Sequence, residues 1–190
     1  MTTDRMPPIP DDQMTAAQRA AADALRAGPR KGVKGPFIPL MRSPALMDRL
    51  QRVGEYLRFD SALPRRLSEF STLVVSRHWT QQFEWFVHVP LAQQAGTSAE
   101  TVAALREGRR PAGMSDDEAL VHDLIVELQA NRGISDATYA AAVARLGEQG
   151  VIDLVATAGY FTLISMVLNV ARTPNEPNPE VAPLPPLPGA

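Results

Sequence analysis

The segment from His78 to His88 gathers side chains that can carry out chemistry. Its eleven residues contain both tryptophans of the chain and two of its three histidines. If the chain is helical from about Thr80, a step of about 100° per residue places four side chains on one face. These four are Gln81, Glu84, Trp85 and His88. An amide, an acid, an indole and an imidazole on one face can form a proton-handling pocket with an apolar wall.

His88 and Glu84 are the candidate proton-transfer residues of this segment. Histidine changes its charge near neutral pH, so His88 can give or take a proton. Glu84, one helical turn earlier, can orient the imidazole or act as the base itself, and the residues alone leave open which of the two is the base. A structural i,i+4 pair, stabilising the helix by roughly 0.2–0.5 kcal/mol, is the alternative.

The elements that position these side chains are predicted to be helices throughout. Cap residues and apolar spacing predict helices over residues 16–26, 44–59, 64–78, 80–96, from 98, 115–132, 135–146 and 151–172. Residues 28–43 are rich in Gly and Pro and are expected to form an ordered loop over one end of the core. Since no strand pattern or hairpin turn is present, the predicted fold class is all-α, a single-domain, multi-helix bundle.

Three regions follow from this reading of the chain. Residues 1–13 are expected to be an N-terminal arm, 14–172 the helical domain, and 173–190 a Pro-rich C-terminal tail, extended or disordered. The apolar stretch 151–172 and the Ala-rich helices exceed what one small bundle needs to cover. We therefore expect a homo-oligomer, either a dimer, a trimer or a hexamer.

Composition excludes several classes of function. The 190 residues are 45% hydrophobic and 21% charged with a net charge of −2, which gives no reason to expect nucleic acid or an anionic membrane as partner. No apolar run is expected to reach the length of a membrane span, and the polar N-terminus lacks a signal-peptide core, which predicts a cytoplasmic protein. The absence of cysteine excludes disulfides, thiolate metal sites and thiol redox chemistry.

The block from Leu63 to Gly96 resembles the carboxymuconolactone decarboxylase family, which also contains the alkyl hydroperoxidase D proteins. The peroxidase branch has a glutamate, a Cys-x-x-Cys pair twelve and fifteen residues later, and a histidine four residues after the second cysteine. At these spacings the chain has Glu69, Gln81, Glu84 and His88. The resemblance covers residues 45–110 well and the end of the last helix more loosely. It implies an alkyl hydroperoxidase D-like (AhpD-like) bundle.

Gln81 and Glu84 replace the two cysteines, so thiol peroxidase chemistry is excluded for this chain. The resemblance then implies the lactone decarboxylase branch, which acts on a small dicarboxylate lactone from aromatic-acid breakdown. The expected function is a cofactor-free lyase that uses acid–base chemistry on a small carboxylated lactone or enolisable acid. The alternatives are a non-catalytic small-molecule-binding protein, or another lyase or isomerase on the same scaffold.

The remaining candidates complete the expected site. Glu69 is a candidate catalytic residue, or else a buried carboxylate that ties helices together through a nearby arginine. Substrate binding is assigned to Gln81, Trp85, His78, Arg66 and Arg77, the arginines as partners of a substrate carboxylate. His122 is expected at the surface or an interface. No metal site is predicted, because no spacing matches a metal-binding motif.

Overall fold

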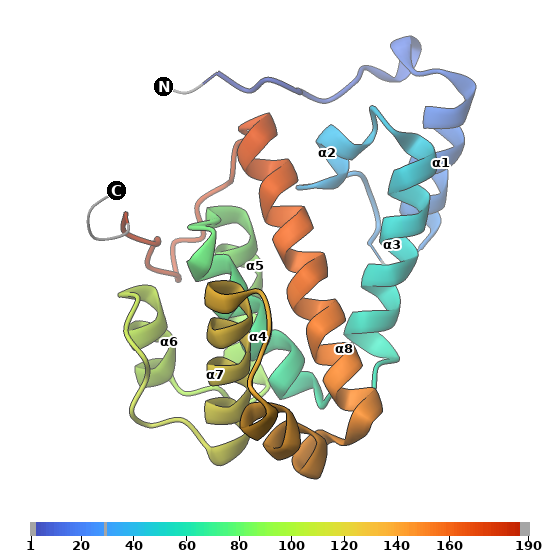
Figure 1. Ribbon diagram of the computed structural model, residues 1–190. Helices are drawn as coiled ribbons and strands as arrows, with labels where there is room; N and C mark the ends of the chain where they lie inside the picture. The colour runs from blue at the N-terminus through green and yellow to red at the C-terminus, as the bar shows by residue number, and fades with distance from the viewer. Residues whose placement is uncertain (1–2, 29, 187–190) are drawn as a thin grey trace.

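A computed structural model describes residues 3–28 and 30–186, and helices alone make up the regular structure of this part (Figure 1). The all-α class and the single-domain bundle are therefore confirmed. The first two residues of the expected arm, Pro29 at the expected end of the first helix, and residues 187–190 of the expected tail lie outside the described residues.

Three helices form one side of the molecule. Helix α1 (Ala16–Ala27) begins at Thr15, which makes a full capping box with Gln18. Helix α3 (Pro44–Phe59) starts with proline in its first turn, as expected. The loop predicted over residues 28–43 is not wholly irregular, because Phe37–Leu40 form the one-turn helix α2. Burial of Phe37 and Leu40 in the core holds that turn in place.

The next two helices carry the segment with the tryptophans and histidines. Helix α4 (Arg65–His78) is buried along nearly its whole length, and it packs against α5, α7 and α8. Helix α5 (Gln82–Gln94) begins later than predicted. Thr80 has a left-handed φ of 47°, so it turns the chain, and the side chain of Gln81 caps the helix by accepting from the backbone N–H of Phe83.

Serine caps begin the last three helices. They are α6 (Ala99–Arg106), α7 (Asp116–Asn131) and α8 (Asp136–Ala171), capped by Ser98, Ser115 and Ser135. Gly147 has non-helical angles inside α8 (φ 70°, ψ 167°), so α8 consists of two helices joined at a kink, as predicted, and the second begins directly after Gly147 and not at Val151. The long part after the kink runs through the middle of the molecule, with α1–α3 on one side and α4–α7 on the other (Figure 1).

Helix α8 is long and apolar enough to cross a membrane by length and composition alone. This corrects the expectation that no apolar run reaches that length. Within the protein, however, 56% of its most apolar window is buried. Its buried residues include Leu154, Phe161, Ile164 and Leu168, which pack in the core. Burial of this kind is typical of the central helix of a helical bundle.

Both ends of the described chain are bound to the bundle. The backbone N–H of Arg5 donates to the carbonyl of Ala171 (2.8 Å), which ties the N-terminal arm to the end of α8. Residues 174–186, here called the strap, are irregular, with a turn at residues 178–181, and lie along α5 and α6 (Figure 1). Val181 and Leu184 of the strap are buried, and Trp85 donates its indole N–H to Ala182 (3.1 Å).

Candidate active site

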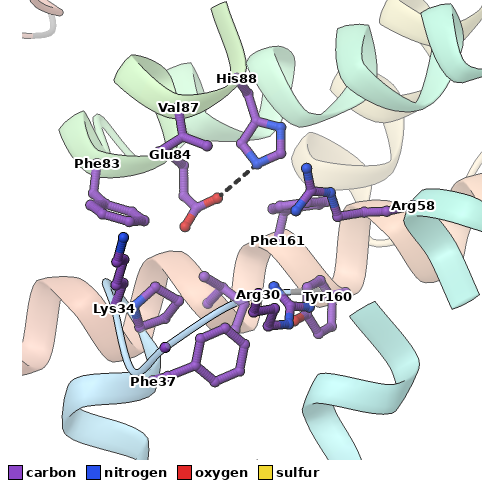
Figure 2. Close-up of a pocket in the computed structure, with 13 residues that line it drawn as sticks. Arg30, Lys34, Phe37, Arg58, Phe83, Glu84, Val87, His88, Tyr160 and Phe161 are labelled. Atoms are coloured by element: carbon purple, nitrogen blue, oxygen red, sulfur yellow. Dashed lines mark ion pairs between the residues drawn. The ribbon is translucent and has the colours of Figure 1, made fainter. Parts of the chain in front are cut away.

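A cavity of about 310 Å³ lies between α5, α8, the end of α3 and the loop that precedes α2. Figure 2 shows the side chains that point toward it. Its lining combines one acid, one imidazole, one phenol, three cations and several apolar groups. They are Glu84, His88, Tyr160, Arg30, Lys34, Arg58, Phe37, Phe83, Val87, Phe161 and Ile164.

Two carboxylates hold His88 from opposite sides. Its Nδ1 lies 2.6 Å from Oε2 of Glu69 on α4, and its Nε2 lies 3.3 Å from Oε2 of Glu84. All three side chains are buried, with 3–5% of each residue exposed. Glu69 does not line the cavity, whereas Glu84 does and points into it (Figure 2). The three groups form a row, here called the Glu–His–Glu row, which leads from the core to the cavity.

The hydrogen bond with Glu69 places one proton on Nδ1 of His88. An ionised Glu69 can only accept, so Nδ1 of His88 donates to it and the tautomer is set. Nε2 of His88 then faces the carboxylate of Glu84 at 3.3 Å, at the wall of the cavity. A proton on a ring nitrogen in this position can be passed to, or taken from, a bound molecule.

In the pKa values of His88 and Glu69, the pairing of charges in the row outweighs the effect of burial. Burial alone disfavours the imidazolium, but hydrogen bonds to Glu69 and Glu84 raise the pKa of His88 above its ordinary value of 6.5. Burial likewise opposes ionisation of Glu69, but the hydrogen bond with His88 and the charges of His88, Arg58 and Arg65 together outweigh it and lower the pKa of that carboxyl below 4.5. Each group therefore favours the charged form of the other.

Three cations face the Glu–His–Glu row across the cavity. Arg30 and Lys34 come from the loop before α2, and Arg58 comes from the last turn of α3 (Figure 2). The Nε of Arg58 is buried and has no hydrogen-bond partner among the described residues. With Glu84 as the acid in the lining, the cavity carries an excess of positive charge. It is suited to an anionic molecule.

Aromatic side chains complete the wall. The ring of Phe161 meets the imidazole of His88 edge to face at a centroid distance of 5.0 Å. The hydroxyl of Tyr160 lies close to Gly54 of α3, where any side chain would collide with it. Burial raises the pKa of Tyr160 although the charge of Arg30 opposes this, so the hydroxyl is a hydrogen-bond donor at neutral pH.

Two of the predicted substrate-binding residues lie on α5 but outside this cavity. Gln81 donates to Oδ1 of Asn169 (2.7 Å) while it caps the helix. Trp85 is fully buried and faces the strap. The cavity opens on the other side of Glu84, along the arc that Phe83 and Val87 share with it. One residue step of about 100° separates the two sides.

The other predicted residues also have partners elsewhere. Arg66 pairs with Glu118 (2.8 Å), and Nη1 of Arg77 donates to the carbonyl of Pro185 in the strap (2.7 Å). His78 and His122 line a different cavity, and His122 is buried, with 8% exposed. The partner of Glu69 is His88, whereas the arginine pairing considered from the sequence is absent from the described residues.

Sequence reasoning missed the cations and the phenol of the cavity. Arg30, Arg58 and Tyr160 come from three segments that are distant in sequence, so no local spacing links them. One signal was present in the loop GPRKGVKG, where three cations alternate with glycines. Gly35 in this loop has a φ of 52°, and a Cβ there would overlap the ring of Phe83. The loop thus approaches α5 closely enough to bring Lys34 to the cavity.

The arrangement offers acid–base chemistry more readily than metal binding. Among residues 3–28 and 30–186, no three His, Asp or Glu side chains gather as a group that could hold a metal ion. In the Glu–His–Glu row both imidazole nitrogens face carboxylates instead of a shared centre.

Comparisons with known proteins agree with the resemblance stated from the sequence. Residues 44–122 match the Carboxymuconolactone decarboxylase family. The chain is similar in structure to an uncharacterized peroxidase-related protein from Silicibacter sp. TM1040, with a TM-score of 0.70 and 14% identity over 95% of this chain and 96% of that one. At this identity the likeness shows the fold alone. No curated protein matches the sequence.

Proposed function

We propose that this protein, whose residues 44–122 belong to the carboxymuconolactone decarboxylase family, is a cofactor-free enzyme that acts on a small carboxylated lactone or enolisable acid. One observation carries the proposal. The buried Glu–His–Glu row ends in a cavity whose opposite wall presents Arg30, Lys34 and Arg58. Such a site can bind an anion and move a proton on it.

The cations hold the substrate in the proposed complex. Arg30 and Arg58 can each bind a carboxylate through two parallel N–H groups, and Lys34 adds a single charged donor. The unpartnered Nε of Arg58 supports this role, because a buried donor is stabilised by an acceptor on the ligand. The apolar side chains, Phe161 and Val87 among them, cover the uncharged part of the molecule.

The Glu–His–Glu row moves the proton in the proposed reaction. Glu84 or His88 removes a proton from the carbon next to the substrate carbonyl, and the electron pair of the broken C–H bond forms an enolate. Tyr160 and the arginines stabilise the oxygen of that enolate by hydrogen bonds and charge. Return of the proton at another carbon shifts the double bond and leaves the enzyme unchanged.

A decarboxylation on the same site differs in the bond that breaks. The C–C bond to a carboxylate breaks, its electron pair forms the enolate, and CO₂ leaves. The acid of the row then protonates the carbon. Glu69 does not reach the cavity in either reaction, so its role is to position and charge His88.

A binding protein without catalysis is the second candidate. It is favoured by the occupation of both imidazole nitrogens, since a histidine held by two carboxylates is also a stable structural unit. In that case the same cavity binds a small carboxylate and releases it unchanged. Another lyase or isomerase would use the same groups on a substrate of different shape.

Turnover measurements on variants separate these functions. The purified protein is incubated in D₂O with small carboxylated lactones and 2-oxo acids, and NMR follows deuterium uptake, double-bond shift and loss of carboxylate. We expect H88Q and E84Q each to lower kcat by about 10²-fold. Glu148→Gln, on the exposed surface of α8, is the matched control and keeps full activity.

Several results would contradict the enzyme proposal. Turnover by H88Q and E84Q at the wild-type rate, with folded protein shown by circular dichroism, would exclude the row from catalysis. Binding of these acids without any turnover would favour the binding protein. R58Q should raise KM more than it lowers kcat, because Arg58 is assigned to binding.

We also propose that the protein is a homo-oligomer. Large apolar side chains are exposed on α3 and on the part of α8 after its kink: Val53, Tyr56, Phe59, Ile152, Met166 and Val170. The hydroxyl of Tyr56 donates to Asp153 (3.2 Å), so the end of α3 lies beside α8. A second copy on this surface would cover them. Sedimentation at micromolar concentration that finds a 20.6 kDa monomer would refute this proposal.

The cytoplasmic location of the protein stays a prediction.

A further inference from the structure

A second cavity of about 310 Å³ lies between the end of α4, α6 and α7. Within the described residues it shares no lining residue with the first cavity. Its walls are mostly apolar, from Val74, Leu105 and Val126, and Val126 is 45% exposed, which places it at the opening. The proposed function makes no use of this cavity.

Arg77 is the main polar group of the second cavity. Only 5% of the residue is exposed, and its Nη1 donates to the carbonyl of Pro185 in the strap (2.7 Å). Its Nε and Nη2 are buried and have no hydrogen-bond partner among the described residues. These two N–H groups lie on one edge of the guanidinium, side by side. That edge has the geometry that binds a carboxylate through two parallel hydrogen bonds.

Other donors line the same space. The Nε2 of Gln129 is buried and also lacks a partner within the described part of the chain. His122 donates or accepts at Nδ1 with Asp123 (2.9 Å), which leaves its other ring nitrogen for the cavity. Arg109 lies at the rim, paired with Glu107. No Asp or Glu among the described residues lines the cavity, so the ligand must supply the acceptors.

We propose that this cavity is a second ligand site, specific for a small carboxylate with an apolar body. The unpartnered edge of Arg77 binds the carboxylate, and the amide of Gln129 donates to one of its oxygens. The side chains of Val74, Leu105 and Val126 enclose the apolar part. An inorganic anion would fill the polar end alone and leave these apolar walls in contact with water.

Calorimetric titration of the full chain with benzoate tests the proposal. Benzamide, which has the same shape without the charge, and inorganic phosphate, which has charge without an apolar body, are the comparison ligands. Titrations are carried out in wild type and in R58Q, where binding in the first cavity is weakened. We expect benzoate binding to persist in R58Q, and benzamide and phosphate to bind at least about tenfold more weakly.

Two variants address the second cavity separately. R77Q removes the paired N–H groups of Arg77, and V126F narrows the opening of the cavity without changing Arg77. When each is added to R58Q, benzoate binding should weaken about tenfold or more. R106Q is the matched control, because Arg106 holds the strap through Pro183 (2.7 Å) and does not line the cavity. It should leave the affinity unchanged.

The opposite results overturn the site. Benzoate binding that is absent at millimolar concentration in R58Q, or equal in R58Q and its R77Q and V126F derivatives, would exclude a ligand in the second cavity. A loss in R106Q as large as that in R77Q would assign the effect to the strap. Equal affinity for benzamide or phosphate would refute the ligand class. None of these results depends on turnover at the Glu–His–Glu row.

Discussion

Replacing Glu69 by glutamine tests whether a buried carboxylate sets the charge of the imidazole at the cavity wall. In the native protein Nδ1 of His88 lies 2.6 Å from Glu69, and both side chains are buried. Hydrogen bonds to charged groups stabilise a protein by roughly 1.5–3 kcal/mol, and removal of one partner from a buried ion pair costs about 3–5 kcal/mol. Glutamine keeps an oxygen that accepts from Nδ1, and Glu84 still contacts Nε2. We therefore expect the lower range, a loss of about 1.5–3 kcal/mol in the free energy of unfolding.

The pH dependence of this loss has a definite sign. The pKa of His88 is raised in the folded state, so its contribution to stability is fully present below 6.5 and disappears as the pH rises through the folded value. The pKa of Glu69 is lowered, so its contribution is present above 4.5 and disappears as the pH falls through the folded value. The difference between wild type and E69Q should therefore be largest between pH 4.5 and 6.5.

Urea unfolding at a series of pH values and NMR titration of the imidazole together measure the effect. The NMR signal of His88 should titrate at a lower pH in E69Q than in wild type, because the variant lacks the carboxylate that stabilises the imidazolium. E148Q, which replaces an exposed glutamate on α8, is the control and should change neither the free energy of unfolding nor the pH at which His88 titrates. The reasoning is refuted if His88 titrates at the same pH in both proteins, or if the stability loss is independent of pH.

Three further predictions concern other parts of the molecule. G54A should lower the free energy of unfolding, measured in urea, by about 1–3 kcal/mol, and it should also weaken carboxylate binding. The reason is that a Cβ at this position collides with the hydroxyl of Tyr160 and comes within 2.8 Å of Arg30. An unchanged free energy of unfolding would mean that these two side chains move aside at no cost. S115A should cost about 1 kcal/mol in the same assay, since it removes the capping box that Ser115 makes with Glu118 at the start of α7, and a neutral result would contradict it. Hydroperoxide consumption with a dithiol reductant should equal the protein-free control, because the chain has no cysteine, and robust turnover would disprove the exclusion.

The starts of most helices could be predicted because a cap is a local interaction. Thr15 and Ser115 each bond to the backbone three residues later, and the sequence alone displays that spacing. The predicted start of α5, with Thr80 as its cap, was wrong because Thr80 adopts a left-handed conformation that is uncommon for threonine. The turn is held by hydrogen bonds to both neighbouring helices, from the Gln81 N–H to Ser76 of α4 (2.8 Å) and from Asn169 of α8 to the carbonyl of Trp79 (3.2 Å), and the cap is Gln81.

The site divides in the same way between local and distant information. Glu84 and His88 lie one turn apart, so their contact follows from helical geometry. Which side of Glu84 opens into a cavity does not follow, because α5 carries apolar residues on all sides and packing alone decides the outcome. Trp85 faces the strap for this reason. Arg30 and Arg58 reach the cavity only through tertiary packing, which no spacing in the sequence encodes.

The strap is bound in a way that makes its stiffness matter. Most hydrogen bonds between the bundle and the strap are accepted by carbonyl groups of the strap, those of Ala182, Pro183, Leu184 and Pro185. A carbonyl is the same in every residue, so these hydrogen bonds survive most substitutions in the strap. What the prolines contribute is a restricted set of conformations before docking, and replacing one by alanine should weaken docking by about 0.4–1 kcal/mol without removing any of these hydrogen bonds. Apart from Val181 and Leu184, whose side chains are buried, the strap is therefore constrained by its conformational entropy more than by the identity of its side chains.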